Sequence, residues 1–217
     1  MHLPLPTTTT ALLALLSSTS LALPNPQPQF SFPGGTGGST RNDLSGVCKP
    51  ITVIYARGTG ESGNVGSVAG PPFFSALDSA FGAGNVAVQG VDYAATAAGF
   101  GGDPAGNSKM AGLVGTAVSK CPKTQIVVSG YSQGAMLVHN SASSYSAAGK
   151  AAIKAAVLFG DPYNGRAIPG ISAGNVKTFC AAGDSVCAGA AIITPAHLSY
   201  GGNAGEAAAF VKGKIRL

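Results

Sequence analysis

Two stretches of this sequence match the pattern G-x-S-x-G, which places a serine on a tight turn. They are GYSQG at residues 130–134 and GISAG at residues 170–174. A serine on such a turn can attack an ester or amide carbonyl, provided that a neighbouring base removes its proton. The pattern therefore predicts a hydrolase that works through an acyl-enzyme, and the surrounding sequence decides between the two serines.

Ser132 is the candidate nucleophile because its surroundings fit that turn. It follows the apolar run QIVV at residues 125–128 and precedes a stretch with apolar residues at helical spacing. A strand, a strained turn and a helix are the context that the pattern requires. Ser172 lies after Pro169 and before NVKTFC, which favours a strand. We interpret GISAG as a chance match in a glycine-rich loop.

The general base is found by elimination, since the chain holds three histidines. His2 falls in a segment that we expect to be removed. His139 lies seven residues after Ser132 on the same predicted helix, which separates the two by roughly 10 Å along the helix axis. His197, in the segment TPAHLSYGG, is left as the base.

A carboxylate should orient this histidine and stabilise its protonated form. Asp184 in CAAGDSVC is the first candidate, and Asp161 in LFGDPYNG is its competitor. We favour Asp184 because a disulfide between Cys180 and Cys187 would hold its loop in place. Asp161 precedes Pro162, and capping of that turn explains it. The resulting order of serine, aspartate and histidine is that of α/β-hydrolases.

The charge that develops on the carbonyl oxygen during attack needs donors in fixed positions. We expect one donor at Gln133, directly after the nucleophile, and another at Thr59 in the loop ARGTGESGNVG. The same loop is glycine-rich, but it lacks the G-x-x-x-x-G-K-[ST] pattern of a phosphate-binding loop. This chemistry calls for no metal and no cofactor.

Strands and helices that would position these residues alternate along the chain. Runs rich in β-branched and aromatic residues predict buried strands at residues 51–56, 86–90, 125–130, 155–160 and 176–180. Apolar residues at helical spacing predict helices at residues 71–82, 108–121, 133–145 and 205–215. The alternation favours a parallel α/β sheet with helices on both faces, in which sites form at the carboxyl ends of the strands.

The first forty residues differ in character from the rest. Residues 1–23 contain the apolar run TALLALLSSTSLAL, which is typical of a secretory signal peptide and too short to span a membrane. Residues 24–40 form a Pro/Gly/Ser-rich leader or pro-segment without charge, and residues 41–217 form the folded catalytic domain. We therefore expect a secreted, extracellular protein.

Four cysteines in an oxidising compartment favour two disulfides, and their spacing lacks the paired ligands of a structural zinc site. Of three possible pairings, we favour Cys180 with Cys187, which leaves Cys48 with Cys121. The net charge of +5 arises from residues scattered along the chain, without a basic run or interleaved aromatic side chains. We therefore exclude nucleic-acid binding and interpret these residues as a solvated basic surface.

Four motifs, ARGTGESGN, GYSQGA, CAAGDSVC and HLSYG, together resemble those of fungal cutinases, in the family that also contains acetylxylan esterases. The resemblance runs from about Arg41 to Leu217. It implies a compact three-layer α/β-hydrolase fold with a central five-stranded parallel sheet, no lid over the serine, and both disulfides as paired above. The positions that match the cutinase triad and oxyanion hole are Ser132, Asp184 and His197, with Thr59 and Gln133.

The resemblance also implies a substrate, namely cutin or a similar aliphatic polyester, and a monomer. Ile192, Ile193 and Leu198 would form an apolar rim around the serine. Two features depart from the cutinase pattern. The segment YAATAAGFGGDPAG lacks the asparagine that supports the oxyanion loop in cutinases. The Gly-Asp-Pro sequence at residues 160–162 is similar to the one in acetylxylan esterases. An acetylxylan esterase, or a secreted binding or elicitor protein without turnover, is the alternative.

Overall fold

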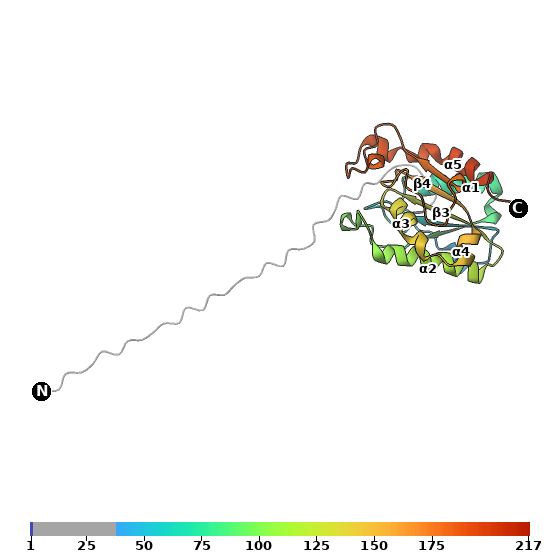
Figure 1. The fold of residues 1–217 in the computed structure, drawn as a ribbon, viewed down its shortest axis with the longest axis horizontal. Helices are drawn as coiled ribbons and strands as arrows, with labels where there is room; N and C mark the ends of the chain where they lie inside the picture. Colours follow the sequence, from blue (N-terminus) through green and yellow to red (C-terminus); the bar gives the residue numbers. More distant parts are fainter. Residues whose placement is uncertain (2–37) are drawn as a thin grey trace.

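The structure is a computed structural model that describes Met1 and residues 38–217. Apart from Met1, the expected signal peptide lies outside the described residues, and so does the expected leader up to residue 37. Residues 38–217 form a sheet with helices on both faces (Figure 1).

Five strands form the central sheet, and every neighbouring pair is parallel, as predicted. The strands are β1 (Ile51–Ala56), β2 (Val86–Gly90), β3 (Gln125–Tyr131), β4 (Ile153–Phe159) and β5 (Val176–Phe179). Their order across the sheet is β2-β1-β3-β4-β5. All six residues of β1 are buried, because helices cover both faces of the sheet.

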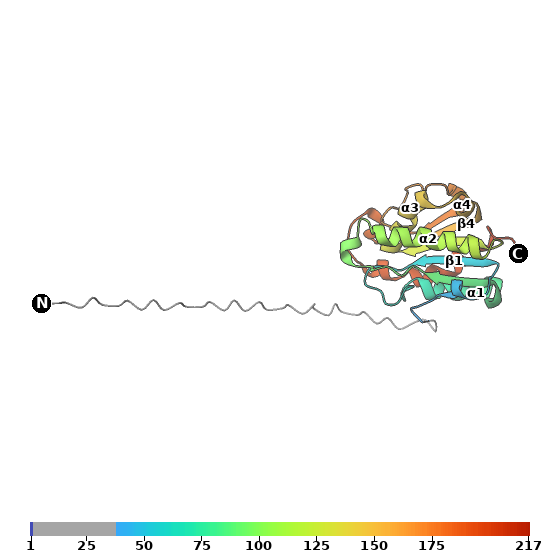
Figure 2. The same ribbon diagram turned by 90° about the horizontal axis from the view of Figure 1, so that it is seen from below.

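The helices lie in two layers. They are α1 (Gly70–Phe81), α2 (Pro104–Lys120), α3 (Gln133–Ser141), α4 (Ala147–Ala152) and α5 (Ala204–Lys212). α1 and α5 cover one face of the sheet, and α2, α3 and α4 cover the other (Figures 1 and 2). Consecutive residues of β1 face opposite layers, so that Val53 packs in a core with Phe73 of α1, and Ile54 packs in a core with Met110 of α2.

Two helix ends differ from the prediction. α2 begins at Pro104 rather than at residue 108, because the Asp103 carboxylate caps its first turn and a proline fits there. α3 ends at Ser141, and the short helix α4, which sequence analysis missed, follows after the cap residue Ser146. The other strand and helix ends lie within three residues of the prediction.

The register of the strands gathers their carboxyl ends at one edge of the sheet. Tyr131 at the end of β3 pairs with Phe159 at the end of β4, and Phe159 pairs with Phe179 at the end of β5. The loops after β1, β3, β4 and β5 therefore start side by side. These loops carry the predicted site residues.

Both disulfides that we favoured are present, namely Cys48 with Cys121 and Cys180 with Cys187. The first joins the segment before β1 to the end of α2, across 73 residues of sequence. The second closes a loop directly after β5, across seven residues. No helix in the described part of the chain is long and apolar enough to cross a membrane.

Candidate active site

Ser132 lies at a strained turn between β3 and α3. Its backbone has φ 55° and ψ −122°, and among the described residues only one other non-glycine residue, Ala95, has a positive φ. Such a conformation is costly for a residue with a Cβ and persists where the surrounding structure enforces it, most often at active sites. The amide of Ser132 donates to the carbonyl of Phe159 in β4, at 2.9 Å, which helps to hold the turn.

Two glycines let the strand and the helix meet around this serine. A Cβ on Gly134 would lie 2.0 Å from the carbonyl oxygen of Ala56 in β1, and a Cβ on Gly130 would lie 2.2 Å from the carbonyl oxygen of Gly134. These atoms belong to the backbone and cannot move aside. Glycine at both positions therefore permits the close packing of strand and helix at this turn.

Ser172, in the second G-x-S-x-G match, has a different setting. Its side chain is exposed, and its backbone has φ −67° and ψ 144°, an ordinary extended conformation. It precedes a short 3-10 helix and then β5, as the sequence indicated. The turn at Ser172 therefore has none of the strain found at Ser132.

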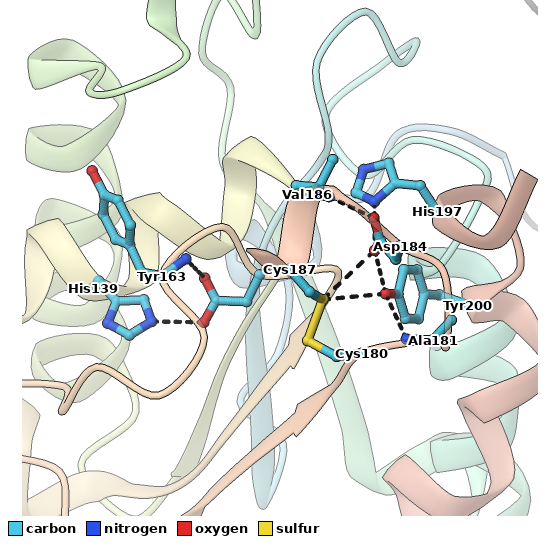
Figure 3. Close-up of a disulfide and its surroundings, with 10 residues drawn as sticks. His139, Tyr163, Cys180, Ala181, Asp184, Val186, Cys187, His197 and Tyr200 are labelled. Carbon is cyan, nitrogen blue, oxygen red and sulfur yellow. Dashed lines mark hydrogen bonds and ion pairs between the residues drawn. A yellow bond between two sulfur atoms is a disulfide. The ribbon is translucent and has the colours of Figure 1, made fainter. Parts of the chain in front are cut away.

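His197 lies in a 3-10 helix at Pro195–Leu198 and is 1% exposed. Its Nδ1 atom lies 2.8 Å from Oδ2 of Asp184, so the structure brings these two predicted residues together (Figure 3). The Nε2 atom of the same ring is buried and has no partner among the described residues. With the proton on Nδ1, Nε2 carries a free lone pair that can accept a proton.

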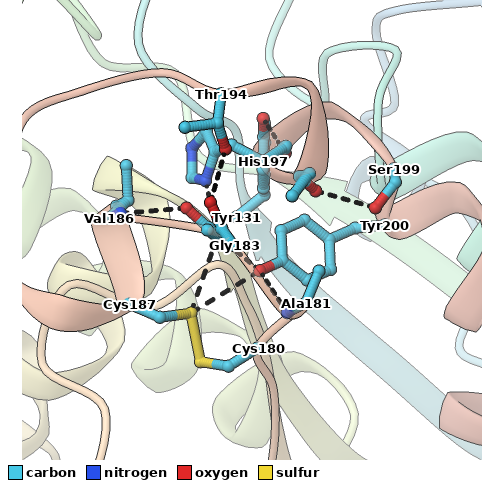
Figure 4. Close-up of polar contacts among 12 residues, drawn as sticks. Tyr131, Cys180, Ala181, Gly183, Val186, Cys187, Thr194, His197, Ser199 and Tyr200 are labelled. Atoms are coloured by element: carbon cyan, nitrogen blue, oxygen red, sulfur yellow. Dashed lines mark hydrogen bonds and ion pairs between the residues drawn. A yellow bond between two sulfur atoms is a disulfide. The ribbon is translucent and has the colours of Figure 1, made fainter.

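Tyr131, the residue before Ser132, places the His197 ring next to the turn. Its ring stacks on the imidazole with centroids 5.0 Å apart, and its hydroxyl donates to the carbonyl of His197 at 2.8 Å (Figure 4). Gly160, after β4, lies against the same imidazole, where a Cβ would approach Cε1 to 2.7 Å. The strand ends thus form a close-fitting site for this ring.

Asp184 lies in the loop that the Cys180–Cys187 disulfide closes. Burial raises the pKa of its carboxyl, but hydrogen bonds from His197, Tyr200 and the amide of Val186 outweigh burial and hold the pKa below its ordinary value. Asp184 is therefore ionised at neutral pH. Its loop is also tied to the segment that precedes His197, because the hydroxyl of Thr194 donates to the carbonyl of Gly183 at 3.0 Å (Figure 4).

The two residues that sequence analysis rejected, His139 and Asp161, bind each other. Their Nε2 and Oδ2 atoms lie 2.9 Å apart, and both side chains are buried. The other oxygen of Asp161 accepts the amide N–H of Tyr163 at 2.8 Å, which is the turn capping that we predicted. The pairing with His139 was missed, because the two residues lie on different elements and no local pattern links them.

The loop after β1 carries Thr59, which is exposed, and is organised by a residue that sequence analysis did not single out. The carboxylate of Glu61 accepts the backbone N–H groups of Gly58, Ser67 and Val68 at 2.7, 2.8 and 2.9 Å. Glu61 thus joins both halves of this loop. The sequence did contain a signal for this role of Glu61, because it is the single acidic residue inside a glycine-rich loop whose backbone N–H groups need acceptors.

Gln133 is fully buried and joins a second loop to the site. Its side-chain Nε2 donates to the carbonyl of Thr96 at 2.8 Å, and the amide of Gly60 donates to the carbonyl of Ala95 at 2.8 Å. The segment after β2 therefore supports both the loop of Thr59 and the start of α3. The backbone N–H groups of Thr59 and Gln133 have no acceptor among the described residues and remain available.

Three large apolar side chains in the chain segment that contains His197 are exposed. Ile192, Ile193 and Leu198 are 63%, 58% and 39% exposed, and Leu198 directly follows His197. In the described part of the chain, no three His, Cys, Asp or Glu side chains gather as metal ligands would.

Comparison with known protein sequences gives one consistent match. The family model described as cutinase matches residues 47–215. Two curated relatives named cutinase, from Botryotinia fuckeliana and Monilinia fructicola, are each 52% identical to this chain over 168 residues, which is 76% of this chain and 83% of the relative.

Comparison with solved structures agrees. Trichoderma reesei cutinase in complex with a C11Y4 phosphonate inhibitor is 41% identical, with a TM-score of 0.78, over 83% of this chain and 81% of that one. An acetylxylan esterase solved at 0.90 Å resolution is 25% identical, with a TM-score of 0.63, over 77% of this chain and 99% of that one.

Proposed function

This chain belongs to the cutinase family, and on that premise we propose that it is a secreted serine esterase with Ser132, His197 and Asp184 as its triad. The observation that carries the proposal is the state of the His197 ring. Its Nδ1 binds the Asp184 carboxylate, its Nε2 is buried without a partner among the described residues, and the ring stacks on Tyr131, the residue before Ser132. A general base needs a free lone pair of this kind, and the serine needs such a base.

The reaction is a two-step acyl transfer. Ser132 Oγ attacks the ester carbonyl as His197 Nε2 takes its proton, and the ester C–O bond then breaks as the alcohol leaves with that proton. Water repeats the sequence on the acyl-enzyme. Asp184 stabilises the imidazolium formed in each step, and the backbone N–H groups of Thr59 and Gln133 hold the oxyanion.

The exposed apolar rim supports an aliphatic polyester of the cutin type, together with short acyl esters, as the substrate. Ile192, Ile193 and Leu198 offer apolar surface to a substrate chain. The relatives named cutinase are 52% identical to this chain, against 25% for the acetylxylan esterase. Both observations favour the polyester over acetylated xylan.

The experiment measures hydrolysis of p-nitrophenyl esters of increasing acyl length, with Ser132→Ala and Ser172→Ala as matched variants. We expect the fastest hydrolysis at butyrate or longer, loss of nearly all activity in Ser132→Ala, and full activity in Ser172→Ala. A serine-directed phosphonate should label Ser132 alone. Retention of more than a few per cent of activity by Ser132→Ala contradicts the proposal.

Other outcomes distinguish the alternatives. Activity on acetate alone and release of acetate from acetylated xylan would favour an acetylxylan esterase. Absence of activity on every ester and of phosphonate labelling would favour a binding or elicitor protein. The N-terminal sequence of protein recovered from culture medium tests secretion, which predicts that residues 1–23 are absent.

A further inference from the structure

The hydroxyl of Tyr200 contacts the same carboxylate that binds His197. Tyr200 lies in a 3-10 helix at Tyr200–Asn203 and is 1% exposed. Its Oη atom lies 2.5 Å from Oδ2 of Asp184, the oxygen that also lies 2.8 Å from His197 Nδ1 (Figures 3 and 4). The other oxygen, Oδ1, accepts the amide N–H of Val186 at 2.9 Å.

The surroundings decide which way the tyrosine proton points. The amide of Ala181 donates to Tyr200 Oη at 3.0 Å, so Oη acts there as an acceptor. Burial raises the pKa of Tyr200, which keeps the phenol protonated. The Cys187 sulfur lies 3.5 Å from Oη but, being in a disulfide, carries no hydrogen to donate. The single proton of Tyr200 is therefore directed at Asp184, which can only accept.

Two donors thus share one carboxylate oxygen. A carboxylate oxygen that accepts a phenol holds a neighbouring imidazolium less strongly, because part of its charge is already compensated. We propose that Tyr200 is a positioning residue that limits the basicity of the Asp184–His197 pair and so extends esterase activity to lower pH. This inference rests on the proposed function of the same site.

Removal of the hydroxyl has a predictable sign. Burial raises the pKa of Asp184, and the hydrogen bonds of His197, Tyr200 and Val186 lower it. Loss of the Tyr200 donor leaves more charge on Oδ2 for the imidazolium, so a higher pH is needed before His197 can act as a base. The acid limb of the pH-rate profile should therefore move to higher pH.

Tyr200→Phe isolates this effect, because it removes one oxygen and keeps the ring. The ring packs edge-on against the imidazole of His197, with centroids 6.0 Å apart, and against the phenyl ring of Phe159, with centroids 6.3 Å apart. Tyr145→Phe is the matched control. Tyr145 is also a buried tyrosine, but its hydroxyl bonds Ser141 at 2.7 Å and contacts no residue of the proposed triad.

The experiment compares kcat/KM for p-nitrophenyl butyrate from about pH 4 to pH 9 in the wild type and both variants. We expect the acid limb of Tyr200→Phe to move up by about half a pH unit or more, because the carboxylate then stabilises the imidazolium more strongly. KM should change little, and Tyr145→Phe should match the wild type. An unmoved acid limb in Tyr200→Phe, or an equal shift in both variants, would overturn the inference.

A second measurement does not depend on turnover. The pH midpoint at which the His197 ring titrates can be followed by NMR in Ser132→Ala, with and without Tyr200→Phe. We expect the pH midpoint to be higher in the double variant than in Ser132→Ala alone. Equal midpoints in the two proteins would contradict the proposed role of Tyr200. If the wild type hydrolyses no ester, the proposed function fails, whereas the NMR comparison still decides the role of Tyr200.

Discussion

His139 Nε2 lies 2.9 Å from Asp161 Oδ2, on the face of the sheet that α3 covers, and both side chains are buried. The pair joins the carboxyl-terminal half of α3 to the turn after β4. It parallels the pair of Asp184 with His197, since in each an imidazole is held by a buried carboxylate. The difference lies in the other ring nitrogen of His197, which is buried without a partner among the described residues, in a ring that stacks on Tyr131, the residue before Ser132.

This parallel predicts different effects when each of the two pairs is broken. His139→Ala leaves the Asp161 carboxylate buried without its partner, which should lower the free energy of unfolding by about 3 kcal/mol while retaining esterase activity. Asp184→Asn should lower kcat by roughly 10⁴-fold, because the histidine then adopts the wrong tautomer. Urea unfolding and ester hydrolysis measure both. Equal loss of activity in the two variants would contradict the assignment.

Glu61 should influence turnover through the loop of Thr59. In Glu61→Gln, an amide group replaces one oxygen that accepts backbone N–H groups, so the loop can no longer be held on both sides. We expect kcat to fall about 10²-fold, as when one oxyanion donor is lost, with little change in KM. Glu206→Gln, whose carboxylate is 60% exposed and pairs with Lys177, is the control. An unchanged kcat in Glu61→Gln would rule out this role.

Gly134→Ala tests the close contact between α3 and β1. The added Cβ would lie 2.0 Å from the Ala56 carbonyl oxygen, and such a clash should cost about 3 kcal/mol. Gly112→Ala is the matched control, since no atom lies within 4 Å of the added Cβ at that exposed position of α2. Alanine in a helix should there increase stability by about 1 kcal/mol. Chemical denaturation measures both, and similar effects would contradict the contact.

The two disulfides should affect different properties. Replacement of Cys48 and Cys121 by serine opens a closure of 73 residues, which should cost about 4 kcal/mol by chain entropy. Replacement of Cys180 and Cys187 opens a closure of seven residues, which should cost only about 2 kcal/mol. The second change should nevertheless reduce kcat more, because it frees the loop of Asp184. Parallel Tm and kcat measurements decide this, and the reverse order of kcat values would refute it.

Stability should decrease in acid partly through Asp43. Burial raises the pKa of this carboxyl, but the hydrogen bonds of Arg41 and the Val88 amide, with the nearby positive charges, hold it below its ordinary value of 3.8. A group with a lowered pKa stabilises the fold above that value, and its contribution is lost as the pH falls further. Asp43→Asn should therefore flatten the decline in unfolding free energy below about pH 4. Asp92→Asn, at a 78% exposed carboxylate, should not.

Local pattern was sufficient for much of the architecture. Apolar runs predicted all five strands, because a parallel strand covered on both faces needs apolar side chains throughout. The strand, turn and helix around Ser132 were also readable, since a serine between two glycines leaves a distinct signature. The start of α2 was misplaced because its capping residue, Asp103, lies outside the apolar periodicity that was used.

Local sequence patterns were therefore sufficient for the order of the elements, the strained turn and the short set of residues able to pair with its serine. The hydrogen-bond partners of several buried polar groups became known only from the folded structure. Glu61 with three loop amides, Tyr200 with Asp184, and His139 with Asp161 are hydrogen bonds of this kind. A hydrogen bond between segments depends on how strand register and helix packing orient the two groups. The periodicity of apolar residues indicates which side chains are buried, but it does not identify the hydrogen-bond partner of a buried polar atom.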